Sequence, residues 1–214
     1  MLTKVEYRES VLYQLAGGIP VADLLGRYSP MLVDRVIGEC YDALLANAYR
    51  QSSAARGTSD LAMLDAYTKA FPNVSVLYNT DREEYYSSLP APIIILPEGM
   101  GIRFISWMKD QATQFIPITN NALSVFDELE VSKTSTLPTY YIEANTVYFN
   151  FLGEPLSNVL MKLVPSYFYL NDEDYVGDPQ IVGKGGFVTV TDMVRQKLLT
   201  MPPEDTANDN VERQ

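Results

Sequence analysis

Apolar residues recur at helical spacing through much of the first third of the chain. Ser29-Pro30 is typical of a helix start, with serine as the cap and proline at the first helical position. From there apolar residues follow at intervals of three and four, which predicts one amphipathic helix of about 25 residues. Its apolar positions are Leu32, Val33, Val36, Ile37, Cys40, Tyr41, Leu44, Leu45 and Ala48. Residues 50–57 are polar, and we expect a loop there.

Shorter helices are predicted on either side of it. Residues 4–16 mix apolar and charged side chains and end at Gly17-Gly18, a common helix stop. Ser59-Asp60 indicates the start of another helix, which Pro72 would end. Residues 192–201 predict a helix near the end of the chain. The apolar faces of the first three helices are narrow, so we expect some apolar surface to face the β region or a neighbouring subunit.

After Pro72 the pattern changes to short β-favouring runs separated by turns. Within Tyr85–Ile118, the apolar run Ile93–Leu96 predicts a core strand and Ile102–Trp107 a second one. Gly99 and Gly101 lie between these runs and can supply the positive φ angles of a tight turn. Further strands are predicted at 74–78, 115–118, 140–142, 146–151 and 159–164, with an extension of the sheet at 167–170, a loop at 171–186, and a helix or a loop at 120–129.

These elements predict an α+β fold, in which an N-terminal helical segment precedes an antiparallel β-sandwich or barrel-like domain. The helical segment spans residues 1–72 and the β-rich domain residues 73–200. Residues 201–214 form a polar tail that we expect to be flexible.

The chain is acidic, with a net charge of -11, and the surplus is unevenly placed. Residues 1–56 hold six basic and six acidic side chains, so the whole surplus lies in residues 57–214. Such a surface repels phosphate, which argues against adhesive binding to DNA but is compatible with a channel that DNA slides through. The sequence also has 15 tyrosines, which suit either sheet packing or buried interfaces with partners.

Several kinds of chemistry are excluded by composition. The chain has no histidine and one cysteine, Cys40, so histidine-based nucleophile systems, disulfides within the chain and thiolate metal cages are ruled out. Cys40 lies in the apolar helical pattern and is expected to be a core residue. No apolar run reaches the ~20 residues of a membrane span, and the charged first residues do not resemble a signal peptide. We therefore expect a soluble protein without a membrane partner.

Three groups of residues invite a catalytic or binding interpretation, and none fits its template. The acidic cluster Asp172, Glu173, Asp174 and Asp178 lacks the glycine and glutamate that a calcium loop needs at its sixth and twelfth positions. Gly183-Lys184-Gly185-Gly186 lacks the spacing and the hydroxyl of a phosphate-binding loop, which favours a hairpin or loop. Asp127, Glu128 and Glu130 have no second shielded acid nearby. We expect no catalytic, cofactor-binding or metal-binding residues, and no enzyme.

The stretch from Tyr85 to Ser106, followed by Phe115-Ile-Pro-Ile, resembles virion structural proteins of tailed phages. In particular, it resembles the small ring or adaptor proteins beneath the portal in crAss-like and other short-tailed phages. The likeness continues through Thr139–Phe149 and Val159–Val164 and covers about half of the chain.

This resemblance implies a non-enzymatic connector in the virion, made in the host cytoplasm. It implies a ring of about a dozen copies that seals the head-to-tail joint and lets DNA pass through its lumen without specific binding. The implied partners are other copies of the chain, the portal protein and other tail or connector proteins. Two alternatives stay open: another virion component, such as a tail hub or capsid accessory protein, and a carbohydrate-binding or hydrolytic β-sandwich.

Overall fold

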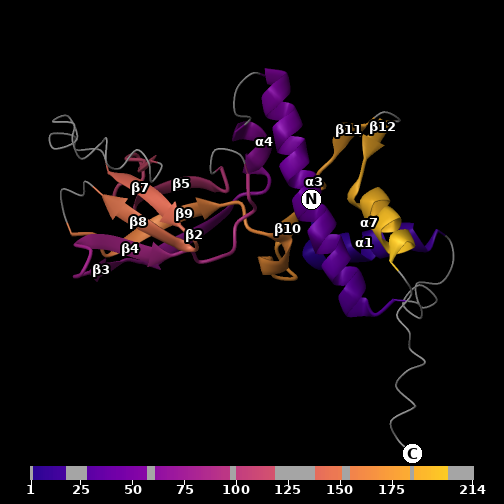
Figure 1. The fold of residues 1–214 in the computed structure, drawn as a ribbon, viewed down its shortest axis with the longest axis horizontal. Coiled ribbons are helices and arrows are strands. Elements are labelled where there is room, and N and C mark those ends of the chain that lie inside the picture. Colours follow the sequence, from indigo (N-terminus) through magenta and orange to yellow (C-terminus); the bar gives the residue numbers. More distant parts are fainter. Residues whose placement is uncertain are drawn as a thin grey trace, which may run out of the picture. The chain divides into compact units, whose positions relative to one another are not determined.

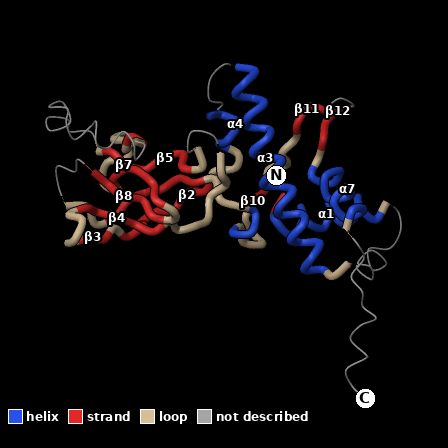
Figure 2. Tube along the Cα trace, in the orientation of Figure 1, coloured by secondary structure: helices blue, strands red, loops and turns tan. Residues whose placement is uncertain are grey.

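The computed structural model describes residues 2–17, 28–56, 61–96, 100–118, 138–150, 155–183 and 186–201. The chain forms two compact units. Unit 1 combines residues 1–67 with residues 166–214, and unit 2 is residues 68–165. The chain therefore leaves unit 1 once and returns to it. The secondary structure differs between them: helices dominate unit 1 and strands dominate unit 2 (Figures 1 and 2).

Unit 1 is built on the helix α3, Pro30–Arg56. The Ser29 hydroxyl accepts a hydrogen bond from the Leu32 amide at 3.3 Å, which confirms the predicted cap. The predicted apolar stripe is buried at every position from Val33 to Ala48, whereas Leu32 is half-buried. Tyr49, which was not predicted, is buried as well. The expected loop at 50–57 is wrong for residues 50–56, which stay helical because the segment has no helix-breaking residue before Gly57.

Two capped helices pack in the same unit. The helix α1, Lys4–Ala16, begins with a capping box between Thr3 and Glu6 and ends at Gly17 with φ 59°. The helix α7, Val190–Thr200, begins with a second capping box between Thr189 and Asp192. Both helices were predicted from the sequence. Val194 and Leu198 of α7 are buried, and α7 contacts both α1 and α3.

Short elements complete unit 1. They are the helix α4 (Leu61–Asp65), the 3-10 helix η2 (Tyr167–Tyr169), the antiparallel pair β1 (Leu2–Thr3) with β10 (Tyr175–Val176), and the hairpin of β11 (Ile181–Gly183) and β12 (Gly186–Val188). Two predictions are corrected here. Residues 167–170 form a helical turn and not a strand, and the expected loop at 171–186 contains β10 and β11.

Unit 2 is a β-sandwich of two open sheets. One sheet has the order β2-β9-β5, with β2 at Lys69–Ser75, β9 at Asn158–Leu163 and β5 at Ile102–Trp107. The other has the order β3-β4-β8-β7-β6, and its strands are Leu77–Asn79, Glu84–Ser88, Thr146–Asn150, Thr139–Glu143 and Ile116–Pro117 in that order. All pairs are antiparallel except β6 with β7, which is parallel.

The core of unit 2 joins both sheets. Phe149 and Val147 of one sheet belong to the same buried cluster as Met161 and Ile105 of the other. Phe115 packs edge-on against Phe149, with ring centroids 5.8 Å apart. This cluster agrees with the predicted α+β fold and selects a sandwich over a barrel.

The strand prediction for Ile93–Leu96 is wrong. This segment makes one isolated bridge, from Ile93 to Pro165, and Ile95 is 87% exposed. Pro90 and Pro92 have no amide hydrogen to donate, which discourages continuous pairing. The turn glycine Gly101 also acts differently from the prediction. Its φ is not positive, and a Cβ there would lie 2.6 Å from the Ile94 carbonyl oxygen, so the position requires close backbone approach.

The predicted domain boundaries differ from the observed units. The helix expected to reach Phe71 ends at Asp65, and Lys69–Ser75 is a strand because it pairs with β9. Residues 166–200 were assigned to the β-rich domain but belong to unit 1. Asp42 on α3 accepts hydrogen bonds there from the Ser166 hydroxyl at 2.5 Å and from the Tyr167 amide at 2.9 Å. Residues 120–129 and the tail at 202–214 lie outside the described residues.

Candidate interaction surface

The helix α1 has apolar side chains on more than one side. Tyr7, Val11 and Ala16 are buried in unit 1, whereas Tyr13 is 75% exposed. Successive residues of a helix point about 100° apart, so Val11, Leu12 and Tyr13 cannot all face the same core. The sequence of α1 therefore leaves apolar surface in solvent.

This surface includes an open groove, which we call the α1 groove. It has a volume of about 540 Å³ and is lined by Leu2, Glu6, Glu9, Ser10, Leu12 and Tyr13. Hydrogen bonds from the backbone and side chain of Thr3 lower the pKa of Glu6, so its carboxylate is ionised at neutral pH. The α1 groove is thus lined by apolar side chains and by the carboxylates of Glu6 and Glu9.

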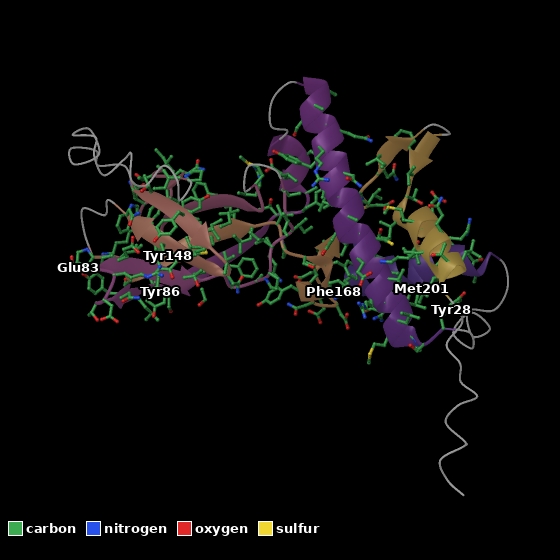
Figure 3. All side chains as sticks on the ribbon, in the orientation of Figure 1. Tyr28, Glu83, Tyr86, Tyr148, Phe168 and Met201 are labelled. Atoms are coloured by element: carbon green, nitrogen blue, oxygen red, sulfur yellow. The ribbon has the colours of Figure 1, made fainter. Side chains whose placement is uncertain are left out.

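Other elements of unit 1 also expose large apolar side chains. Met31 at the start of α3 is 83% exposed and Leu199 at the end of α7 is 76% exposed. Phe187 on β12 and Tyr175 on β10 are exposed as well. Phe168 of η2 lies across α3, where Gly38 makes room for it, because a Cβ at Gly38 would come within 2.5 Å of the ring (Figure 3). These side chains lie on separate elements, and each is a position where a partner protein would bury apolar surface.

The acidic cluster of Asp172, Glu173, Asp174 and Asp178 does not act as one group in the structure, because two of its carboxylates hold different partners. Asp174 accepts a hydrogen bond from the Asn171 amide at 2.7 Å and so closes its own turn. Asp178 instead accepts from the Tyr7 hydroxyl at 3.1 Å. Among the described residues, no three carboxylate or thiol side chains are grouped so that they could hold a metal ion.

The structure describes two of the three other residue groups that the sequence singled out. Gly183 pairs with Gly186 in the β11–β12 hairpin, which is the interpretation that the sequence favoured over a phosphate loop. Asp127, Glu128 and Glu130 lie outside the described residues. Cys40 is buried, and burial raises the pKa of its thiol, as expected of a core residue.

Unit 2 has a row of tyrosines on the outer face of its larger sheet. Tyr86, Tyr148 and Tyr141 lie opposite one another on β4, β8 and β7, and Figure 3 labels the first two. Tyr141 stacks on Tyr148 with ring centroids 5.0 Å apart, and the Arg82 guanidinium lies 5.2 Å from the centre of the Tyr148 ring. These rings pair with each other and with Arg82, which leaves little free ring face for stacking on a sugar.

Polar contacts hold this row in place. The Tyr141 hydroxyl donates to Glu84 at 2.9 Å, and burial together with that contact raises the pKa of Tyr141. Arg82 is also ion-paired with Glu143 at 2.9 Å. The arrangement favours a structural role for the tyrosine row. The alternation of β4 and β8 could have revealed it, but the register between those strands could not be read from the sequence.

Comparison of the sequence with protein-family models and with curated proteins finds no match. In the part of the chain that the structure describes, no helix is both long enough and apolar enough to cross a membrane.

Proposed function

We propose that this protein is a non-enzymatic structural component of a tailed-phage virion. In this role it forms a ring in the head-to-tail connector below the portal, contacts other copies of itself and the portal or neighbouring tail proteins, and lets DNA pass. The proposal rests on the resemblance described above, together with one structural observation: the apolar surface that α1 leaves in solvent.

That surface supports a role in assembly because exposed apolar side chains are stabilised when a partner covers them. A ring requires a head-to-tail contact between two different surfaces of the subunit. Unit 1 offers several separate exposed positions, on α1, α3, α7 and the β11–β12 hairpin, so it has more than one surface to use.

The charge of both units is compatible with the passage of DNA. Unit 1 carries 17 acidic and 10 basic side chains, and unit 2 carries 10 acidic and 6 basic ones. From the sequence, the excess of acidic over basic side chains was assigned to residues 57–214, which include the β-rich region. Residues 166–214 hold nine acidic and four basic side chains and belong to unit 1, so both units are acidic. An acidic lumen would not retain the phosphate backbone whichever unit lines it.

The test is the composition of purified particles. Mass spectrometry of virions should find the protein at about a dozen copies for each portal, and a knockout of the gene should yield filled heads without tails. Particles that lack the protein, or normal tailed particles from the knockout, would contradict the proposal.

A further inference from the structure

Unit 1 contains a cavity beside α1 that none of the roles above uses. It has a volume of about 650 Å³ and lies between α1, the turn after α4, the segment after β10 and the start of α7. We call it the Asp178 pocket. Its lining residues are Leu2, Tyr7, Ser10, Val11, Gln14, Ala66, Tyr67, Val176, Gly177, Asp178, Gln180, Thr189 and Thr191. The size is typical of pockets that bind small molecules or peptide side chains.

The charge of this pocket has one sign. Asp178 is the one ionisable acid or base, tyrosines aside, among the described residues that line it. Its Oδ1 accepts a hydrogen bond from the Tyr7 hydroxyl at 3.1 Å, and its Oδ2 accepts from the Gln180 amide at 3.3 Å. A carboxylate can accept about four hydrogen bonds, so both oxygens keep capacity for a further donor. The pocket therefore favours a ligand that is positively charged and has several N–H donors.

Aromatic rings lie close to this carboxylate. The Tyr67 ring packs directly over Gly177, where a Cβ would come within 2.7 Å of ring atom Cε1. Burial, and then the charge of Asp178, raise the pKa of Tyr67, so its hydroxyl stays protonated. Burial also raises the pKa of Tyr7, and the Asp178 carboxylate raises it further. Tyr7 is buried and packs against Tyr41 and Tyr167, so the half-buried ring of Tyr67 is the one that a guanidinium or ammonium group beside Asp178 can contact.

The Asp178 pocket adjoins the α1 groove. Leu2 and Ser10 line both cavities, so the two share a wall. The α1 groove adds Glu6 and Glu9 to the negative charge, and Leu2, Leu12 and Tyr13 to the apolar surface. An extended peptide can place a basic side chain beside Asp178 and its neighbouring residues along α1. A small free cation would contact the carboxylate but would leave the α1 groove empty.

We propose that the Asp178 pocket binds an arginine or lysine side chain from a segment of another protein, whose neighbouring apolar residues lie in the α1 groove. Arginine fits best, because its planar guanidinium donates two parallel hydrogen bonds to a carboxylate and stacks on tyrosine. This inference concerns recognition at one pocket and does not depend on the protein being a phage connector.

The test uses the full-length protein and two capped pentapeptides that differ in one side chain. The first has the sequence Ala-Leu-Arg-Leu-Ala, and the second has citrulline, which is neutral and nearly isosteric, in place of arginine. Isothermal titration calorimetry should give a dissociation constant on the order of millimolar for the arginine peptide. We expect the citrulline peptide to bind at least about tenfold more weakly, since it loses the charge. Equal affinities, or no binding of either peptide, would overturn the proposal.

Matched variants locate the site. Asp178→Asn keeps an oxygen for the Tyr7 hydroxyl but removes the charge, and it should abolish the preference for arginine over citrulline. Like Asp178, Glu173 is exposed, but it does not line the pocket, so Glu173→Gln should leave that preference unchanged. An arginine preference that survives Asp178→Asn would refute this site. The comparison of the two peptides on the unmodified protein decides the question even if a variant folds poorly.

Discussion

Unit 2 pairs its aromatic residues with one another, whereas unit 1 exposes several of its own. In unit 2, Trp107, Phe115 and Phe149 form a continuous edge-to-face chain inside the sandwich. In unit 1, Tyr7, Tyr41 and Tyr167 form a comparable buried cluster, yet Tyr13 on the same helix as Tyr7 is in solvent. Unit 1 thus has more apolar surface than its own core covers.

This difference follows from the elements themselves. A strand alternates its side chains between two faces, so one face of each sheet can turn entirely to the core of the sandwich. The short helix α1 has apolar residues around much of its circumference and one core to bury them in. Among the described residues, unit 1 exposes eight large apolar side chains and unit 2 exposes four, which are Leu77, Tyr78, Ile95 and Ile116. Unit 1 therefore has the larger apolar surface that a partner could cover.

The largest effect is expected in the core of unit 2. Phe149→Ala should lower the free energy of unfolding by about 3–5 kcal/mol, because Phe149 is 1% exposed and its removal leaves a cavity between the sheets. The single tryptophan, Trp107, lies in β5, so its fluorescence in a urea titration reports this unit. Ile95→Ala, at an exposed position of the same unit, should change stability by less than about 0.5 kcal/mol. Similar losses for both variants would show that unit 2 has no well-packed core.

A smaller effect is expected at the start of α7 in unit 1. Thr189→Ala removes the hydroxyl that accepts from the Asp192 amide at 3.3 Å, and it should cost about 1 kcal/mol. Thr189→Ser retains the hydroxyl and serves as the control. In the alanine variant, the midpoint of the unfolding transition that far-ultraviolet circular dichroism reports should move to a lower urea concentration. The midpoint of the transition that Trp107 fluorescence reports should stay the same. A parallel shift of both signals would show that the two units unfold as one.

The smallest stability effect concerns pH. Lys197 and Arg35 hydrogen-bond to Glu39 and lower its pKa, with Lys197 contributing most. Because the pKa is lower in the folded state, this contribution is present above the unfolded-state pKa and is lost as pH falls through the folded one. Glu39 is about a third exposed, so the gain is screened and should be below about 1 kcal/mol.

Denaturant titrations between neutral and acidic pH check this effect. Glu39→Gln should remove part of the acid-induced loss of stability in unit 1 and leave the Trp107 transition unchanged. An identical pH dependence in the variant and the parent would mean that the ion pairs of Glu39 with Lys197 and Arg35 add nothing to stability.

The sequence predicts the individual elements better than their assembly. Ser29-Pro30 and the three- and four-residue spacing are local signals, and they correctly place α3. The strands β5, β7, β8 and β9 were likewise predicted from β-favouring runs bounded by turns. The two units could not be found this way, because the return of residues 166–201 to α3 depends on contacts such as Asp42 with Ser166, which are 124 residues apart.

The candidate surfaces were only partly visible in the sequence. The expectation that the helices leave some apolar surface matches the exposure of Tyr13, although the sequence alone does not name that residue. The Asp178 pocket was missed, since Asp178 was grouped with its sequence neighbours and not with Tyr7, which is 171 residues away. The spacing of residues along the sequence does not predict a hydrogen bond between two residues that are so far apart in the chain.

We infer that α1 presents a surface that another subunit completes, and the variant Tyr13→Ser tests this inference. Tyr13 is exposed, so its replacement should change the free energy of unfolding by less than about 0.5 kcal/mol. The variant, and Ile95→Ser in unit 2 as a matched control, would each be supplied in place of the natural gene to a phage that lacks it. The amount of each variant in purified particles would then be compared with the amount of the unmodified protein. We predict normal incorporation of Ile95→Ser and a clear loss for Tyr13→Ser. Equal incorporation of the two variants would contradict the claim.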